Sequence, residues 1–449
     1  MSKMTLGSLF DGSGGFPLGG MLAGITPVWA SEIEPFPIRV TTKRLPFMKH
    51  YGNVSEMDGG KVEPVDIITF GSPCQDMSVA GKRAGLEGSR SNLFYEAVRI
   101  IKEMRKATGG EYPKWACWEN VPGAFSSSGG EDFRCVLESL CGVIDESVSI
   151  PKPKKWANAG EILGDGYSLA WRVLDAQFWG VPQRRKRIYL IADFTGGCAG
   201  KVLFESEGLS GYSPQGFRSW QTASGCSPDS SGAAGIGFDL NATEQHGVAY
   251  GLDRAAYNQG QNAKFAPCIE SEVEPPMVAR GPGAVAHPVY STSKNSYHTQ
   301  AEEDIVNTLV ATDYKDPPTV TEEPYYTVRR LTPTECARLQ GFPDWWCSAL
   351  GTEEPSEEDI AFWRDVFETH RAVTGSASKP KTDAQLVKWL KDPHTDSAEY
   401  KLWGNGVALP CVYFVLSGIV YFHQLNAERE TSIRCAGRIL LSGRTERRC

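Results

Sequence analysis

The sequence lacks any long hydrophobic run, since no stretch reaches the roughly 18 apolar residues of a membrane span. The amino terminus also lacks the positively charged and apolar pattern of a signal peptide. The twelve cysteines are scattered, with no CxxC pair and no histidine nearby at ligand spacing. We therefore expect no membrane segment, no metal site and no disulfide framework, and a reducing cytosol as the setting.

An excess of positive charge is lacking too, because the formal net charge is −8. This counts only weakly against a nucleic-acid partner, since a DNA enzyme needs no more than a locally positive cleft. What is present, 41% hydrophobic and 22% charged residues, is typical of a globular protein. A length of 449 residues predicts two or three domains.

The stretch around Cys74 organises the rest of the interpretation. The apolar, β-branched run 65–70 predicts a buried strand of a parallel sheet, which ends at Gly71 and Pro73. Cys74 then lies just beyond the carboxyl end of a strand, where open α/β sheets place their ligands. The glycine-rich segment 76–90 predicts a mobile loop. Such a cysteine is either a nucleophile or a small buried hydrophobe, and the rest of the chain favours the nucleophile.

A glycine loop, residues 11–15, follows the first predicted strand over 4–10. Its glycines let the backbone approach a ligand, and the helix predicted over 16–23 would direct its amino terminus at an anionic group. The loop is not a Walker loop, because no Gly-Lys-Ser/Thr follows, and not GxGxxG, because Pro17 holds the last position. A carboxylate is therefore a better candidate ligand than a diphosphate.

Two carboxylates follow predicted strands. Glu32 comes after the strand over 26–30 and about 20 residues after the glycine loop, so it is either a ribose contact or a solvated surface residue. Glu119 ends the buried strand over 115–118, where apolar and tryptophan neighbours would raise its pKa, as a proton donor requires. A capping or salt-bridging glutamate would fit the same position.

Four consecutive cations lead into a strand predicted over 188–192. Such a run is often only a solvated face. Arg185 and Arg187 alternate, however, so their side chains would point the same way and suit an anionic ligand. Further upstream, the segment 149–167 is rich in Pro, Lys and Gly and predicts an exposed loop.

The composition changes at about residue 195. Residues 195–325 are rich in Gly, Ser, Pro, Asn and Gln and predict a loop-dominated domain with a small core. The segment 316–319 resembles the Asp-Pro-Pro-aromatic signature of amino-group methyltransferases, but the aromatic residue is missing and no strand leads into it. Thr332 and Glu335 predict the capping box of a helix, and an apolar helix is predicted over 407–425.

Taken together, these blocks resemble the cytosine-C5 DNA methyltransferase family of bacterial and phage type. They occur in the family's order from residue 4 to about residue 420, and Pro-Cys-Gln, Glu-Asn-Val and Gln-x-Arg-x-Arg in that order are highly specific. The residues that carry the resemblance are Phe10–Gly15, Ser31-Glu32, Gly71–Gln75, Glu119–Val121, Gln183–Arg187, Arg330–Pro343 and Gly404-Asn405.

The resemblance implies an α/β fold, with a Rossmann-like, mostly parallel methyltransferase sheet and a smaller, loop-rich target-recognition domain across a DNA cleft. The implied catalytic and cofactor-binding domain covers 1–195 and is completed by 400–426, which fold back beside the first strand. The implied target-recognition domain covers 196–350. We expect 351–399 to be a peripheral helical insertion and 427–449 a basic tail.

The implied cofactor is S-adenosylmethionine, with its methionine end at the glycine loop, its ribose at Glu32 and its adenine near Ile33 and Asn53. In the family the last block completes the pocket, which implies the same role for Asn405. The expected cofactor contacts are Phe10, Asp11, Gly12, Gly14, Gly15, Glu32, Ile33, Asn53, Val54, Pro73 and Asn405.

The implied reaction methylates C5 of a cytosine flipped out of duplex DNA. Cys74 would attack C6 while Glu119 holds and protonates N3, and the resulting enamine would accept the methyl group at C5. Arg185 is expected to steady the flipped nucleotide and help activate the thiol, and Arg187 to support the loop from behind. The expected DNA contacts are Gln75, Ser78, Arg83, Gln183 and the pair Thr308-Leu309, which resembles the family's Thr-Leu pair.

Three positions depart from the family pattern: Ile33 replaces a frequent aromatic, Asn53 a common acidic residue and Gly406 a common serine. These departures would lower cofactor affinity without removing a group that the chemistry needs. The alternatives are a tRNA cytosine methyltransferase, a catalytically silent DNA-binding homologue and, disfavoured by the absent diphosphate loop, a NAD-binding oxidoreductase. The expected form is a monomer in the cytoplasm of a bacterial or phage-infected cell; whether a cognate restriction endonuclease acts on the same DNA site is open.

Overall fold

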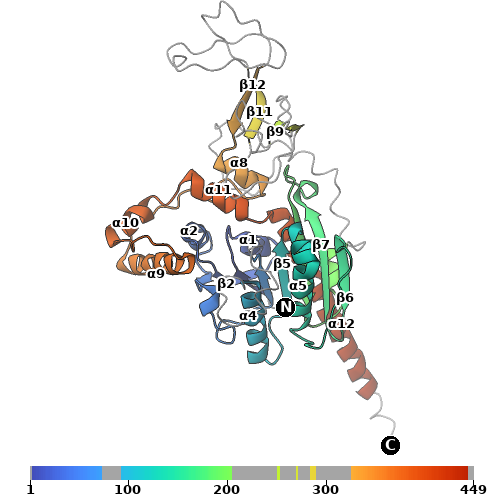
Figure 1. Ribbon diagram of the computed structural model, residues 1–449. Coiled ribbons are helices and arrows are strands. Elements are labelled where there is room, and N and C mark those ends of the chain that lie inside the picture. The colour runs from blue at the N-terminus through green and yellow to red at the C-terminus, as the bar shows by residue number, and fades with distance from the viewer. Residues whose placement is uncertain are drawn as a thin grey trace, which may run out of the picture.

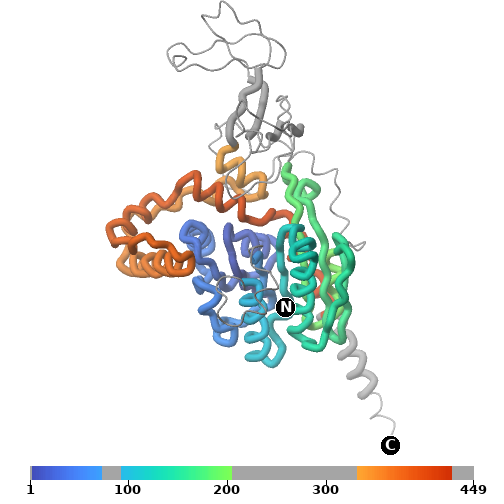
Figure 2. Tube along the Cα trace, viewed as in Figure 1, coloured from blue at the N-terminus to red at the C-terminus, as the bar shows by residue number. Residues whose placement is uncertain are grey.

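The structure is a computed structural model that describes residues 3–72, 93–204 and 331–426 in full (Figure 2). It also describes the backbone of four short strands between residues 250 and 330, and of residues 427–442. All statements about side chains below concern the fully described ranges.

Helices and strands alternate through the first half of the chain, and helices dominate the last quarter (Figure 1). The strands are β1 (Thr5–Leu9), β2 (Thr26–Ser31), β3 (Lys49–His50), β4 (Ile67–Phe70), β5 (Trp115–Asn120), β6 (Ala159–Leu163), β7 (Ser168–Asp175), β8 (Lys186–Asp193), β9 (Tyr250–Leu252), β10 (Ile269–Ser271), β11 (Ala284–Val289) and β12 (Tyr325–Arg330). The α-helices are α1 (Gly15–Leu22), α2 (Pro35–Arg44), α4 (Leu93–Ala107), α5 (Glu131–Cys141), α6 (Ala199–Leu203), α8 (Pro333–Leu339), α9 (Glu357–Thr374), α10 (Asp383–Lys391), α11 (Asp396–Asn405) and α12 (Leu409–Ser442).

The central sheet has eight strands in the order β3-β2-β1-β4-β5-β8-β7-β6. Neighbours from β3 to β5 pair in parallel, while β8 pairs antiparallel with both β5 and β7, and β6 antiparallel with β7. All strands of this sheet except β6 and β8 therefore run in one direction. The prediction of a mostly parallel α/β sheet is confirmed. The other strands form a small antiparallel sheet in the order β10-β9-β11-β12.

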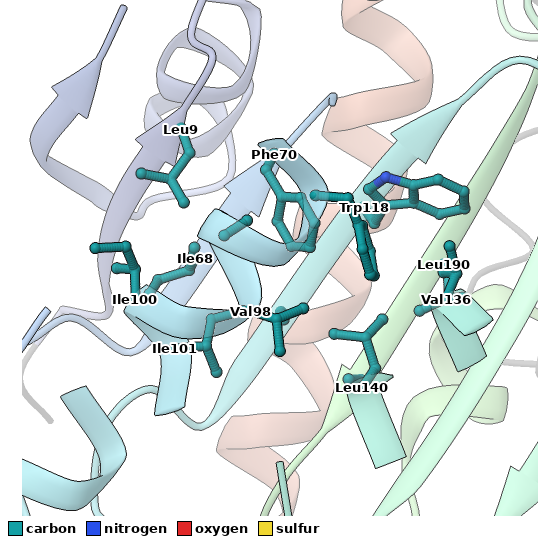
Figure 3. Packing of buried hydrophobic residues seen from close by; sticks show 14 of the residues in the cluster. Leu9, Ile68, Phe70, Val98, Ile100, Ile101, Trp118, Val136, Leu140 and Leu190 are labelled. Atoms are coloured by element: carbon teal, nitrogen blue, oxygen red, sulfur yellow. The ribbon is translucent and has the colours of Figure 1, made fainter. Parts of the chain in front are cut away.

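Helices cover both faces of the large sheet because its strands are apolar on both sides. Ile68 and Trp118 contribute to the core under α4 and α5, and their chain neighbours Ile67 and Cys117 to the core under α1, α6 and α12. Figure 3 shows the first of these cores, in which Ile100 and Ile101 of α4 approach the sheet. The apolar stripe of this helix is thus part of the core.

A third apolar cluster joins α2, α8 and α11. Helix α8 begins with the predicted capping box, in which Thr332 Oγ1 accepts the Glu335 N–H and the Glu335 carboxylate accepts the Thr332 N–H. The helices α9 and α10 pack on α2 through Trp363 and Leu390. The predicted division into domains stays a prediction, although residues 331–350 contribute to the same cluster as α2.

Two local predictions differ from the structure. The segment 149–167, predicted as a loop, contains the edge strand β6, whose side chains alternate between exposed and half-buried and so give no apolar signal. The helix predicted to end at residue 425 continues in the backbone to Ser442. In the described part of the chain no single helix is long and apolar enough to cross a membrane, although the bent pair Asp396–Asn405 and Leu409–Asn426 passes the same test by length and composition.

Gly19 allows α12 to approach α1 closely, so Gly19→Ala should destabilise the fold. A Cβ added at Gly19 would lie 2.6 Å from Cγ1 of the buried Val412. Overpacking costs about 1–3 kcal/mol, more than the gain of about 1 kcal/mol from replacing a helical glycine. We expect a lower urea midpoint, whereas Gly197→Ala, which meets no atom within 4 Å, should leave it unchanged. An unchanged midpoint for Gly19→Ala would contradict this packing.

Candidate active site

The carboxyl ends of β1, β2, β4 and β5 lie along one edge of the sheet, because these strands pair in parallel. This edge carries the glycine loop 11–15 after β1, Glu32 after β2, Gly71 and Ser72 after β4, and Glu119 near the end of β5. Residues from four separate blocks of sequence are therefore brought together, as strand-end placement predicts.

Several predicted site residues lie outside the described residues: Pro73, Cys74, Gln75, Ser78, Arg83, Thr308 and Leu309. The described chain stops at Ser72, whose hydroxyl accepts from Trp118 Nε1 at 3.1 Å and whose carbonyl accepts from Asn120 Nδ2 at 3.1 Å. A Cβ added at Gly71 would lie 3.4 Å from Oε2 of Glu119. Gly71 thus lies beside Glu119, three residues before Cys74 in the sequence.

The glycine loop has a backbone that L-amino acids rarely adopt. Phe10, Gly12 and Gly14 all have positive φ, at 55°, 55° and 75°. Positive φ favours glycine at the latter two positions, whereas Phe10 is strained, a feature that recurs at ligand sites. Trp346 fixes the loop from outside, since its Nε1 donates to the Ser13 carbonyl at 2.8 Å.

Glu32 joins the glycine loop to the end of β2. One oxygen accepts the Gly12 N–H at 2.9 Å, and the other accepts the N–H groups of Ile33 at 2.7 Å and Glu34 at 2.9 Å. Burial raises the pKa of this carboxyl group, although the three hydrogen bonds favour its charged form. The alternative of a freely solvated surface glutamate is therefore excluded, while the ribose contact stays a prediction.

Asp11 is a buried carboxylate with one unused oxygen. Its Oδ1 accepts the Ser8 hydroxyl at 2.6 Å, while Oδ2 and the nearby Ser13 Oγ have no hydrogen-bond partner among the described residues. Burial, with Glu32 nearby, raises the pKa of Asp11 to about 7. The loop therefore holds polar atoms that suit the ammonium or carboxylate end of a ligand.

The positions predicted to contact adenine lie at the same edge. Ile33 is half-buried, and Val54 is buried at the start of a short 3₁₀ turn, Val54–Glu56. Asn53 caps that turn, because its Oδ1 accepts the Ser55 N–H at 3.1 Å. Its amide thus has a structural use in place of the acidic residue that is common in the family.

Glu119 and Arg187 form a mostly buried ion pair. Arg187 Nε lies 3.1 Å from Glu119 Oε1, and the two side chains are 15% and 11% exposed. Burial raises the pKa of Glu119, although Arg187 and Arg185 oppose that rise. The sequence-based expectation of a carboxyl group able to carry a proton agrees with this direction.

Arg185 lies deeper than Arg187 and holds the backbone of the last sequence block. Its Nη2 donates to the carbonyls of Gly404, at 3.2 Å, and Gly406, and its own N–H donates to Asp175 Oδ1 at 3.0 Å. Burial, with Arg187 nearby, lowers its pKa to about 9. Both arginines lie close enough to Glu119 to oppose the rise of its pKa, but Arg185, the one expected to steady the flipped nucleotide, hydrogen-bonds to backbone carbonyls.

The last block folds back onto the glycine loop, as the resemblance implies. Asn405 is exposed at the end of α11, and a Cβ added at the next residue, Gly406, would lie 3.1 Å from Ser13 Oγ. Gln183, predicted to contact DNA, is instead fully buried, and neither atom of its amide has a hydrogen-bond partner in the described chain. Any contact with DNA would require this side chain to be uncovered.

Sequence reasoning missed the residues that support the site from a distance. Trp346 lies 333 residues from its partner Ser13. Asp175 accepts the Arg185 N–H, and Gln340 donates to the Trp403 carbonyl. In the sequence these residues stand out only as polar or tryptophan residues inside otherwise apolar segments. That signal does not identify their hydrogen-bond partners.

The other cysteines of the described chain are poor nucleophiles. All seven are buried and none is in a disulfide, and burial raises the thiol pKa of Cys117, Cys347 and Cys411 above the usual range. In residues 3–72, 93–204 and 331–426 no group of three or more His, Cys, Asp or Glu side chains could hold a metal ion.

A family model described as "C-5 cytosine-specific DNA methylase" matches residues 4–143, 154–196 and 239–357. The named "DNA N-6-adenine-methyltransferase" of Escherichia phage P1 is 27% identical over 477 residues, covering 92% of this chain and 61% of that protein. The Type II methyltransferase M.NgoBV of Neisseria gonorrhoeae is 31% identical over 163 residues, 36% of this chain and 33% of that protein. The chain therefore spans less than two thirds of either relative's length.

Among solved structures, the S. pombe Dnmt2 methyltransferase aligns with a TM-score of 0.47 and 17% identity, covering 94% of this chain and 100% of that one. The family model, in turn, implies S-adenosylmethionine as the methyl donor.

Asp11→Asn should remove a pH dependence of stability. The folded-state pKa of about 7 exceeds the ordinary 3.8, so the wild type should lose stability as pH rises from about 4 through about 7. Across this range the free energy of unfolding of the wild type should fall by roughly 4 kcal/mol more than that of Asp11→Asn, at 1.36 kcal/mol per pKa unit. Urea unfolding across this pH range measures it, with the exposed Asp165→Asn as control; parallel curves for wild type and Asp11→Asn would refute the burial effect.

Proposed function

Because the chain belongs to the C-5 cytosine-specific DNA methylase family, we propose that it transfers the methyl group of S-adenosylmethionine to C5 of cytosine in duplex DNA. The observation that carries this proposal is the buried pair of Glu119 and Arg187, beside the point where the chain leads to Cys74. A proton donor and a cation next to a strand-end cysteine are the groups that covalent activation of a pyrimidine needs.

The glycine loop and its neighbours fit the methyl donor. The unused atoms Asp11 Oδ2 and Ser13 Oγ suit the charged methionine end, and Glu32 lies where a ribose would be bound. Asn405 closes the pocket from the side of the last block. When bound, the donor supplies an electrophilic methyl group on a sulfonium.

Glu119 and Cys74 act together in the first step. The thiolate of Cys74 forms a bond to C6, while Glu119 gives its proton to N3, so that the ring becomes an electron-rich enamine at C5. Burial favours the protonated form of Glu119 before attack, which is the form this step uses.

The second step returns the enzyme to its starting state. C5 takes the methyl group, and the electrons of the broken methyl–sulfur bond remain with the donor. Loss of the C5 proton to solvent water re-forms the C5–C6 double bond and expels the Cys74 thiolate, and the N3 proton returns to Glu119. The base must leave the stack for this chemistry, with 76–90 as the proposed lid.

The contacts favour roles for Arg185 and Arg187 that are the reverse of those predicted from the sequence. Arg187, paired with Glu119, is the better candidate for steadying the flipped base, and Arg185, bound to backbone carbonyls, for positioning the last block. This assignment is part of the proposal.

Adenine N6 methylation is the second candidate, because the phage P1 relative carries that name. The chain covers 61% of that protein, so the name of the whole need not describe the shared part. The Asp-Pro-Pro-Thr segment 316–319, which lies outside the described residues, lacks the aromatic residue of that chemistry. The matched cytosine family favours C5.

Other features of the proposal follow from the family and its Type II relatives. We propose a monomer that acts in the cytoplasm of a bacterial or phage-infected cell, with 196–350 reading the DNA sequence. We propose a restriction endonuclease that acts on the same DNA site as its partner in that setting. The competing hypotheses are a tRNA cytosine methyltransferase and a DNA-binding homologue without catalytic activity.

Nucleoside analysis tests the reaction and substrate together. The protein, labelled S-adenosylmethionine and either mixed-sequence duplex DNA or tRNA should yield label in 5-methyldeoxycytidine from DNA alone. Cys74→Ser should reduce transfer to background, and wild type should form a covalent adduct with DNA that carries 5-fluorocytosine. Label in N6-methyldeoxyadenosine or in tRNA would reject the proposed substrate, and absence of an adduct would reject the Cys74 mechanism.

The two arginines should fail in different ways. Arg187→Ala should lower kcat about a hundredfold or more, because the flipped base loses the cation proposed to steady it. Its loss of stability should be smaller than that of Arg185→Ala, because Glu119 can take up a proton and so avoid being left as an unpaired buried charge. Arg185→Ala should lower stability by about 1–3 kcal/mol, since two buried carbonyls lose their donor. Single-turnover methylation and urea unfolding separate the two effects; a purely catalytic defect in Arg185→Ala would restore the original assignment.

A further inference from the structure

The segment Pro151–Lys155, here named the lysine loop, contains three lysines and two prolines and no acidic residue. In a chain of net charge −8, this is a local concentration of positive charge. All five residues are exposed. The proposed chemistry makes no use of them.

Two contacts hold the lysine loop at the active-site edge of the sheet. Lys152 Nζ lies 3.0 Å from Glu131, at the first residue of α5, and Trp156 Nε1 donates to the Gly130 carbonyl at 2.8 Å. Gly130 and α5 follow the carboxyl end of β5, which carries Glu119. The loop therefore lies on the same edge as the candidate proton donor.

The loop is also anchored from behind. Trp156 is buried and packs edge-to-face on Phe133 and Trp171, with ring centroids 5.1 and 6.1 Å apart. The Ile150 N–H donates to Glu138 Oε1 at 3.0 Å, and prolines 151 and 153 restrict the backbone between the anchors. Holding the loop in advance lowers the entropy cost of binding a ligand.

Lys154 and Lys155 have no carboxylate partner among the described residues, unlike Lys152. The family model matches up to residue 143 and resumes at 154, so the first part of the loop lies outside the matched residues and Lys154 and Lys155 lie within them. An exposed, anchored pair of cations next to the catalytic edge suits a polyanion that crosses this edge.

We propose that the lysine loop binds the phosphate backbone of duplex DNA on the catalytic-domain side of the target base. This inference rests on the proposed function, because it takes the same DNA as its ligand. Phosphate contacts carry no sequence information, so the loop adds affinity and orientation for any duplex while other residues read the sequence.

The double variant Lys154→Gln/Lys155→Gln tests the proposal. The probe is a fluorescein-labelled mixed-sequence duplex, bound by the full-length protein between about 50 and 200 mM KCl. We expect the slope of log K against log[KCl] to fall by about two, at about 0.9 per lost phosphate contact, equally for any duplex. The affinity for S-adenosylmethionine, measured by calorimetry, should stay unchanged. In the methylation assay the KM for DNA should rise, while kcat at saturating DNA should stay the same.

The matched control is Lys3→Gln/Lys106→Gln. Both residues are exposed and lie at the opposite edge, before β1 and in the last turn of α4, so this variant should keep the wild-type slope. A wild-type slope in the lysine-loop variant would overturn the inference, as would an equal loss in the control. Wild-type protein that binds duplex DNA through the loop without methylating it would instead reject the proposed function alone.

Discussion

Arg185 makes the contact on which the assembly of the site depends. Its guanidinium joins β8 to the carbonyls of Gly404 and Gly406, about 220 residues further along the chain. A buried guanidinium is stable only where acceptors surround it, and here the acceptors are the backbone turn that closes the glycine loop. One side chain thereby links the proposed cofactor pocket to the strand beside the proposed catalytic pair.

Burial raises the pKa of two carboxyl groups at this edge. The pKa values of Asp11 and Glu119 are both raised because the strand ends exclude water, yet their neighbours differ. Glu119 faces two cations, whereas Asp11 has a hydroxyl and another carboxylate nearby. One sheet edge therefore offers a group suited to giving a proton to a base and another suited to a charged ligand.

The strand-end logic allowed much of this edge to be predicted from sequence. Short apolar runs identified β1, β4, β5 and β8. The residues after β1, β4 and β5 lie at the common edge, whereas β8 runs antiparallel and brings its amino end to that edge. Strand β6 gave no such signal, because its exposed side chains alternate with half-buried ones. The separate tasks of Arg185 and Arg187 could not be inferred, since two alternating cations look alike until their partners, one of them 219 residues away, are known.

The packing of α12 against α1 has a consequence for synthesis. The apolar face around Gly19 and Phe16 is covered by residues near Val412, which leave the ribosome last among the described core residues. During translation that face stays uncovered while some 390 residues are added, a span in which domains begin to fold from the amino end. The large sheet therefore keeps an apolar face exposed to solvent until α12 has been synthesised.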